Sequence, residues 1–262
     1  MKVVLFCGGL GMRLREYSDT IPKPMIEIGT RPLLWHIMKY YSSFGHKEFI
    51  LCLGYKGDVI KKYFLNYNEC LSNNFVLSNG GKDVKLLNTD TQDWKITFLD
   101  TGLHSNIGQR LKAVEEYLEG EEIFLANYSD GLTDLPLPDY IDYFRRSKKI
   151  ACFLAVKPTS SFHVVEIDDG QTVKSIRHLA ESDIWMNGGF FVFRREIFRH
   201  IGHGEELIYE PFQRLIEKEE LISFKYKGFW TCMDTFKDKQ LLDDMCSRGD
   251  APWEIWKRQP VG

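Results

Sequence analysis

Hydrophobic and polar positions along the first half of the chain follow two alternating patterns. Short apolar runs occur at Lys2–Cys7, Glu48–Leu53 and Glu122–Asn127, and such runs are typical of strands buried on both faces of a parallel sheet. Pro32 opens a run with helical spacing, LLWHIMKYYSSF, which ends at Gly45, and proline at a helix start with glycine after its end is a common arrangement. Repeated strand and helix units of this kind predict a mostly parallel sheet with helices on both faces.

The rest of the chain adds helices and a larger share of strands. Residues 68–100 are richer in Asn, Asp and Thr, which favours short strands and loops over a continued strand–helix alternation. The segment Asp168-Asp169-Gly170 separates two strand-like runs, as in a hairpin turn. We expect further helices at Asp58–Leu65, Gln109–Leu118, Tyr209–Lys218 and Phe236–Cys246, and further strands at Ile150–Val156, His163–Ile167, Val173–Ile176 and Phe190–Phe193. The pattern therefore predicts an α/β fold with a smaller β-rich region in the second half.

The composition excludes several classes of protein. Apolar residues make up 44% and charged residues 27% of the 262 residues, which suits a folded chain rather than a disordered one. The net charge of −3 disfavours nucleic-acid binding. No run resembles a signal peptide or approaches the ~20 apolar residues of a membrane span. The six cysteines form no C-x-x-C pair and no zinc-ligand spacing, which favours reduced thiols in a cytoplasmic protein without a membrane partner.

A glycine-rich turn follows the first apolar run directly. It reads Gly8-Gly9-Leu10-Gly11-Met12-Arg13, and glycines at the end of a parallel strand let backbone N–H groups approach phosphates. Arg13 adds a guanidinium that can hold phosphate oxygens. No Lys-Ser/Thr pair follows, so this is not a P-loop, and Leu14 replaces the third glycine of a dinucleotide fingerprint, which disfavours an NAD-dependent oxidoreductase. A tight turn without a ligand is the alternative interpretation.

Three charged residues stand in positions that suit phosphate and metal chemistry. Lys23 lies between Pro22 and Pro24, and a proline that follows favours an extended conformation at the residue before it. Asp130 follows an apolar run and suits Mg²⁺, which prefers oxygen ligands. Asp234 lies where a strand-like segment meets a helix, and its alternative role is the N-cap of that helix. A solvated loop lysine is the corresponding alternative for Lys23.

The ordered set of segments resembles the sugar nucleotidyltransferase family, and within it the chain is most like the glucose-1-phosphate cytidylyltransferases. The resemblance reaches residue 256 and covers nearly the whole chain. The stretches that carry it are FCGGLGMRL, PKPMIEIGTRPLLWHIMKYY, GYKGDVIKKYF, WKITFLDTG, GQRLK, YSDG, MNGGFFVF, GFWTCMDT and APWEIW. It implies a Rossmann-like nucleotidyltransferase fold in a single domain over residues 1–262, with residues 1–135 mainly binding nucleotide and residues 136–262 mainly binding the acceptor. It also implies Mg²⁺ dependence and a homo-oligomer.

The same resemblance implies a role for each matching residue. Lys23 and Arg13 would act in catalysis by contacting the triphosphate, and Asp130 and Asp234 would hold the metal. The nucleotide would contact Gly8, Gly9, Gly11, Met12, Arg13, Lys23 and Arg110. The acceptor would contact Asn187, Gly188 and Glu210.

The acceptor side departs from the family pattern. The family has a Glu-Lys-Pro motif whose lysine holds the acceptor phosphate, but residues 175–180 read SIRHLA here, and Ser161-Phe162-His163 replaces Arg-Phe-Gly. Arg177, His178 or His163 are candidates for the missing positive charge, although histidine is only partly charged near pH 7. Met12 stands where the family usually has threonine. The acceptor is therefore either glucose 1-phosphate or another phosphorylated small molecule, such as a phosphorylated amino-acid amide.

The activity expected from this resemblance is transfer of CMP from CTP to the phosphorylated acceptor, with release of pyrophosphate. The choice of CTP rests on the cytidylyltransferase branch alone, so UTP or dTTP is the alternative donor. A second alternative is a nucleotide-binding regulatory protein that has lost transfer, which would be consistent with the missing lysine. Lys23, Asp130 and Asp234 argue against that alternative, because a protein that only binds nucleotide need not keep two metal carboxylates.

Overall fold

The computed structural model describes residues 1–9, 21–159 and 162–258. Its centre is an eight-stranded sheet in the order β13-β10-β14-β8-β1-β4-β7, with β15 paired to β10. The β1–β8, β1–β4, β4–β7 and β10–β15 pairs are parallel, whereas β14 runs antiparallel to both β8 and β10. The strands are β1 (Val3–Phe6), β4 (Glu48–Leu53), β7 (Lys95–Asp100), β8 (Ile123–Tyr128), β10 (Ala151–Val156), β13 (Met186–Asn187), β14 (Phe191–Arg194) and β15 (Leu221–Tyr226). The expected α/β fold with a mostly parallel sheet is confirmed.

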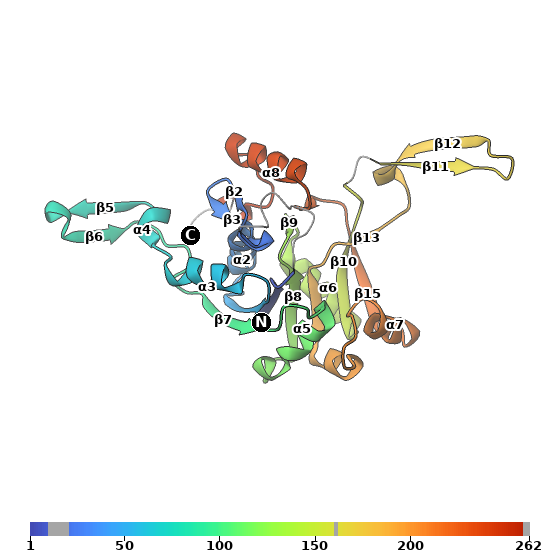
Figure 1. Cartoon of the computed structure of the whole chain (residues 1–262), viewed down its shortest axis with the longest axis horizontal. Coiled ribbons are helices and arrows are strands. Elements are labelled where there is room, and N and C mark those ends of the chain that lie inside the picture. Colours follow the sequence, from blue (N-terminus) through green and yellow to red (C-terminus); the bar gives the residue numbers. More distant parts are fainter. Residues whose placement is uncertain (10–20, 160–161, 259–262) are drawn as a thin grey trace.

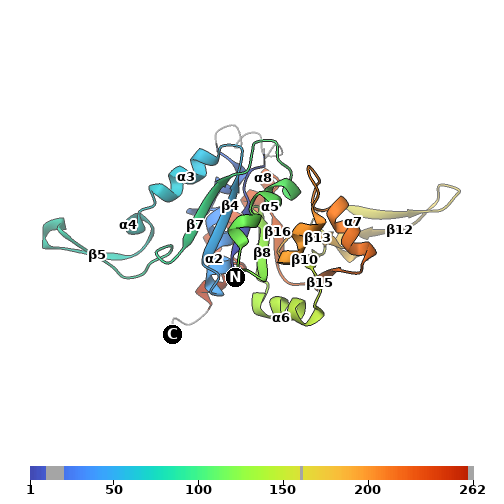
Figure 2. The ribbon, with the colours of Figure 1, turned by 90° about the horizontal axis from the view of Figure 1, so that it is seen from below.

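Helices cover both faces of this sheet, as Figures 1 and 2 show together. Alternate residues of β1 enter two hydrophobic cores, with Val3 and Leu5 in one and Val4 and Phe6 in the other. The first core contains apolar residues of α2 (Leu33–Ser43), α6 (Leu137–Ser147) and α8 (Phe236–Arg248). The second contains those of α5 (Ile107–Ala113), η4 (Glu115–Leu118), η6 (Arg195–His200) and α7 (Glu210–Glu217). Burial on both faces explains why β1 appears in the sequence as an unbroken apolar run.

Shorter elements surround the sheet. In chain order they are η2 (Lys23–Met25), β2 (Glu27–Ile28), β3 (Arg31–Pro32), α3 (Gly57–Leu65), α4 (Glu69–Ser72), β5 (Phe75–Ser78), η3 (Asn79–Gly81), β6 (Asp83–Leu86), β9 (Gly131–Thr133), β11 (His163–Ile167), β12 (Val173–His178), η5 (Leu179–Glu181), β16 (Trp230–Cys232) and η7 (Ile255–Lys257). Within the described ranges, no helix is long and apolar enough to cross a membrane.

Two antiparallel hairpins, β5–β6 and β11–β12, project from opposite ends of the molecule (Figure 1). In the first hairpin, Phe75 pairs with Leu86 and Leu77 with Val84, so one of its faces is apolar. Leu77 is 58% exposed in the single chain. A two-stranded hairpin has little stability of its own in water. A partner surface that covered the exposed apolar face would therefore stabilise this hairpin.

The structure corrects one expectation about the first half of the chain. Residues 68–100 were expected to leave the strand–helix alternation, but β7 (Lys95–Asp100) pairs in parallel with β4 and continues the central sheet. Its residues are exposed or only half-buried because β7 lies at the edge of the sheet. The sequence KITFLD therefore lacks the continuous apolar run that marks β1 and β4.

Candidate active site

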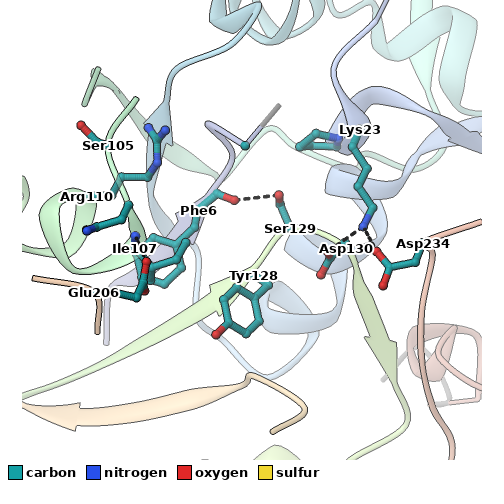
Figure 3. Close-up of a pocket in the computed structure, with 13 residues that line it drawn as sticks. Phe6, Lys23, Ser105, Ile107, Arg110, Tyr128, Ser129, Asp130, Glu206 and Asp234 are labelled. Carbon is teal, nitrogen blue, oxygen red and sulfur yellow. Dashed lines mark hydrogen bonds and ion pairs between the residues drawn. The ribbon is translucent and has the colours of Figure 1, made fainter. Parts of the chain in front are cut away.

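A cavity of about 470 Å³ opens at the carboxyl ends of β1 and β8 (Figure 3). This is the edge at which open α/β sheets bind their ligands. Lys23, Asp130 and Asp234 lie on one side of the cavity, and the residues before and within α5 lie on the other. Its walls are formed by Phe6, Gly9, Lys23, Pro24, Ser105, Asn106, Ile107, Arg110, Tyr128, Ser129, Asp130, Glu206 and Asp234.

The Lys23 ammonium lies between two carboxylates. Its Nζ is 2.7 Å from Asp130 Oδ2 and 2.6 Å from Asp234 Oδ1. The Lys23 side chain is 14% exposed, and those of Asp130 and Asp234 are 31% and 29% exposed. Burial alone would lower the pKa of Lys23, but the two carboxylates more than offset burial and raise that pKa. The lysine is therefore positively charged throughout the neutral pH range.

Local structure places each of these three residues. Lys23 opens the 3-10 turn η2, in which Met25 N–H donates to the Pro22 carbonyl at 2.8 Å. The expectation that Pro24 would hold Lys23 in an extended conformation is therefore wrong; the turn accepts a proline at its second position because the nitrogen there needs no hydrogen-bond partner. Asp130 is the second residue after β8, and its carbonyl accepts from Met233 N–H at 2.9 Å. This bond brings the segment before α8 next to the end of β8.

Asp234 is not the N-cap of the following helix. That position belongs to Thr235, whose side chain accepts from Asp238 N–H in a reciprocal capping box. The Asp234 carboxylate is therefore available to reach Lys23, and the alternative interpretation of Asp234 as a helix cap is wrong. Asp130 and Asp234 are far apart in sequence, yet both carboxylates accept from one ammonium; that they hold a metal stays a prediction.

The donor set at this point fits a magnesium ion. Two carboxylate oxygens from different elements converge on one positive charge, and Mg²⁺ prefers one or two carboxylates supplemented by phosphate oxygens and water. Among the described residues, no group of three or more His, Cys, Asp or Glu could form an all-protein metal site.

Gly8 and Arg110 meet at the end of β1. The Arg110 side chain is buried, and its guanidinium donates to the Gly8 carbonyl at 3.0 Å, to the Leu53 carbonyl at 3.0 Å and to Thr101 Oγ1 at 2.7 Å. A Cβ on Gly8 would lie 2.1 Å from Arg110 Nη1, so any larger residue there would displace the guanidinium from its hydrogen bonds. The Arg110 guanidinium therefore links the ends of β1 and β4 through hydrogen bonds, and Arg110 also forms part of the cavity wall.

The wall formed by the start of α5 was not identified from the sequence. Asn106 caps α5 in a reciprocal box with Gln109, and Glu206 accepts from Ile107 N–H at 3.3 Å. Ser105 and Glu206 complete this side of the cavity (Figure 3). The capping signature N-x-x-Q at residues 106–109 could have indicated the helix start, but nothing local links Glu206 to it.

The expected acceptor residues lie in different surroundings. Asn187 lies next to Tyr128, a residue of the cavity wall, and forms a side-chain hydrogen bond with it. Burial raises the pKa of Tyr128 to about 12, and the negative charges of Glu206 and Asp130 raise it further, whereas the hydrogen bond with Asn187 lowers it. Gly188 is buried, and its carbonyl accepts from Trp230 Nε1 at 2.9 Å. Glu210 is an exposed residue at the start of α7 and is not among the residues that line the cavity.

The basic residues proposed to replace the missing lysine lie at the β11–β12 hairpin. Arg177 is exposed and is 3.4 Å from Glu166 on the neighbouring strand. His178 accepts from Ala180 N–H through Nδ1, and its ring lies edge-on to His163 at 5.5 Å. None of the three lines the cavity at β1 and β8. Gly11, Met12 and Arg13 lie outside the described residues.

Comparisons with known proteins agree with this geometry. The profile of the nucleotidyl transferase family matches residues 2–244. The chain is 41% identical over 260 residues to a glucose-1-phosphate cytidylyltransferase of Salmonella typhi, covering 98% of this chain and 100% of that protein. It is 37% identical over 258 residues to a probable glucose-1-phosphate cytidylyltransferase of Bacillus subtilis, with 98% and 100% covered. The crystal structure of an apo UDP-glucose pyrophosphorylase matches with a TM-score of 0.69 at 14% identity, covering 95% of this chain and 99% of that one.

Proposed function

The chain belongs to the nucleotidyl transferase family and is a nucleotidyltransferase, and from this premise we propose that it transfers CMP from CTP to a phosphorylated small molecule in a Mg²⁺-dependent reaction that releases pyrophosphate. The observation that carries this proposal is the convergence of Lys23, Asp130 and Asp234 beside Gly9 in one cavity. The choice of CTP is supported by the relatives from Salmonella typhi and Bacillus subtilis, which are named as cytidylyltransferases.

The reaction is an in-line displacement at the α-phosphorus of CTP. A phosphate oxygen of the acceptor forms the new bond to phosphorus, and the bond from phosphorus to the bridging oxygen breaks, so that the electron pair leaves with pyrophosphate. A phosphate monoester is already ionised near neutral pH, so no general base is required. The protein therefore acts by positioning the two substrates and by neutralising their charge.

The charged residues and the glycines at the cavity have parts in this scheme. Lys23 would place a positive charge where phosphate charge develops, and Gly9, which lines the cavity, together with Gly8 before it, would allow the backbone to approach the triphosphate. Asp130 and Asp234 would hold the magnesium ion, which when bound supplies positive charge to the phosphate oxygens. The Arg110 guanidinium donates a hydrogen bond to the Gly8 carbonyl and so positions the start of the glycine-rich turn. Arg13, Gly11 and Met12 are proposed to complete the triphosphate site from sequence alone.

The acceptor is either a sugar 1-phosphate such as glucose 1-phosphate or a non-sugar phosphate such as a phosphorylated amino-acid amide. The names of the relatives favour glucose 1-phosphate. The absence of the Glu-Lys-Pro motif and the position of Arg177 and His178 at a projecting hairpin favour a different acceptor. We further propose that the enzyme acts in the cytoplasm, in the synthesis of a surface polysaccharide, as a homo-oligomer whose association covers the apolar hairpin face.

The test is a pyrophosphate-release assay with Mg²⁺, in which CTP, UTP, dTTP and ATP are each combined with a panel of phosphorylated acceptors. We expect CTP to have the highest kcat/KM. Comparable kcat/KM values for UTP and CTP would contradict the assignment of the base. Binding of CTP without transfer to any acceptor would instead support the alternative of a nucleotide-binding regulatory protein.

A further inference from the structure

A second cavity, of about 390 Å³, lies beside the first along the sheet. It opens where β10 and β15 end, and its walls include Lys157, Lys227, Tyr226 and Trp230. β10 and β15 run parallel to each other, and both are antiparallel to β14, which is antiparallel to β8. Their carboxyl ends therefore lie at the same edge of the sheet as the end of β8. Among the described residues that line this cavity, none has an acidic side chain.

Two lysines without a carboxylate partner line this cavity, and a third, Lys225, lies nearby but outside its lining. Within the part of the chain that the structure describes, Lys157, Lys225 and Lys227 form no ion pair. Lys157 Nζ donates to the Ser182 carbonyl and lies 4.6 Å from the Trp185 ring centroid, and Lys225 Nζ lies 5.2 Å from the same ring. The whole chain carries a net charge of −3, so this concentration of uncompensated positive charge is local and attracts an anion.

Trp230 lines the second cavity on the side that faces Gly188 and Gly131. Its Nε1 donates to the carbonyl of Gly188, which belongs to the expected acceptor segment, and the same atom is 3.6 Å from the Cβ position of Gly131, the residue after Asp130. β14 lies between β8 and β10, so Lys157 at the end of β10 is two inter-strand steps, about 10 Å, from β8. β15 lies on the other side of β10, so Lys227 is one further step away, and its long side chain has to extend back toward an acceptor whose phosphate lies at Asp130.

We propose that the second cavity binds a carboxylate at the far end of the acceptor, so that the acceptor carries a negative charge in addition to its reacting phosphate. Lys227 and Lys157 provide the positive charge, and Trp230 forms the wall that guides the acceptor from one cavity to the other. This proposal rests on the proposed function, since it assigns the acceptor of the same reaction. A hexose 1-phosphate without a carboxylate leaves these lysines without an anion, whereas a uronic acid 1-phosphate or a phosphorylated amino-acid amide supplies one.

The test compares two acceptors that differ only in the group at C6. Glucuronic acid 1-phosphate carries a carboxylate there, and glucose 1-phosphate carries a hydroxymethyl group. With CTP and Mg²⁺, the wild-type enzyme is expected to use glucuronic acid 1-phosphate with at least a tenfold higher kcat/KM, as one charge-assisted hydrogen bond predicts. Equal use of both acceptors, or a preference for glucose 1-phosphate, would overturn the proposal.

A pair of matched variants tests the assignment to Lys227. Lys227→Gln is expected to raise the KM for glucuronic acid 1-phosphate about tenfold more than the KM for glucose 1-phosphate, with the KM for CTP unchanged. Lys225→Gln removes the same charge from an exposed neighbour that does not line the cavity, and it should leave all three KM values unchanged. Equal effects of the two variants would mean that general electrostatic attraction, and not a contact in this cavity, is responsible, and would contradict the proposal.

Free glucuronate distinguishes an acceptor subsite from a separate effector site. If the second cavity is part of the acceptor site, free glucuronate should inhibit transfer to glucose 1-phosphate, and this inhibition should be competitive with glucose 1-phosphate. Activation, or inhibition that glucose 1-phosphate does not relieve, would assign the cavity to an effector and overturn the proposal. Failure of the proposed function has a different signature, because no acceptor would then yield pyrophosphate in the presence of CTP.

Discussion

Replacing Lys23 with methionine tests the central feature of the candidate active site. Methionine keeps much of the volume of lysine but removes the ammonium that lies 2.7 Å from Asp130 and 2.6 Å from Asp234. The same two carboxylates are proposed to hold Mg²⁺, so the lysine and the metal compete for them in the protein without nucleotide. We therefore expect Lys23→Met to bind a divalent cation more tightly than the wild type while transferring CMP more slowly.

The geometry sets the size of both effects. Removing one partner of a buried ion pair costs about 3–5 kcal/mol, and the partial exposure of the two carboxylates, 31% and 29%, reduces this to roughly 2 kcal/mol. The same free energy opposes metal binding in the wild type, and roughly 2 kcal/mol corresponds to about a thirtyfold change in affinity. Loss of a positive charge that stabilises the transition state lowers kcat by roughly 10² to 10³.

The assays measure binding, stability and turnover separately. Mn²⁺ binding followed by electron paramagnetic resonance gives the affinity for the cation without nucleotide, and urea unfolding with and without Mg²⁺ gives the linked change in stability. Pyrophosphate release gives the rate. Lys239→Met is the matched control, because Lys239 is also largely buried and pairs with Asp243, which lies outside the cavity.

One combination of results would refute the reasoning. If Lys23→Met binds Mn²⁺ with the wild-type affinity, the carboxylates of Asp130 and Asp234 do not hold the metal. If the same variant also keeps the wild-type kcat, Lys23 has no part in the transfer. A gain in Mn²⁺ affinity in Lys239→Met equal to that in Lys23→Met would show that net charge alone is responsible.

Three further predictions follow from other parts of the molecule. Gly8→Ala should lower kcat/KM for CTP at least tenfold, because the new Cβ would meet the Arg110 guanidinium at 2.1 Å; wild-type kinetics would contradict this. Burial lowers the pKa of His36 from 6.5 to about 4, and its Nδ1 accepts a hydrogen bond from Trp253 Nε1. The free energy of unfolding should therefore fall by roughly 3 kcal/mol as the pH falls from 6.5 to 4. A free energy of unfolding in urea that does not change over this pH range would refute the effect. Leu77→Asp should reduce a homo-oligomer to the 30.6 kDa monomer in light scattering, and a wild-type protein that is already monomeric would refute the role of the hairpin.

The central strands were predictable from the sequence because they are buried on both faces. β1 and β4 appear as unbroken apolar runs, and their neighbours in the sheet contact both sides. Short strands were expected within residues 68–100, but the place of β7 in the parallel sheet was missed, because β7 lies at the edge and lacks a continuous apolar run. The helix α6 was also missed, although Leu137, Tyr140, Ile141 and Phe144 are buried at helical spacing; its many charged residues concealed that signal.

The nucleotide side of the candidate site was more predictable than the acceptor side, for a physical reason. Lys23 and Asp130 each follow a local signal, a proline-flanked turn and the end of a strand, and Asp234 precedes a recognisable helix start. Their meeting at one point depends on the Asp130–Met233 backbone contact, which no local pattern encodes. Lys157 and Lys227 come together only because β10 and β15 are neighbours in the sheet.

The charges on the acceptor side bear on whether the chain has lost transfer activity. The missing lysine of the Glu-Lys-Pro motif would indicate loss if no other positive charge replaced it. At the hairpin, Arg177 is already compensated by Glu166, so it offers little attraction to a second anion. Lys157 and Lys227 have no such compensation among the described residues and follow the ends of β10 and β15, the two strands that lie beyond β14. Under the proposed function, these two lysines would supply the positive charge that the missing lysine does not, which favours a changed acceptor over loss of transfer.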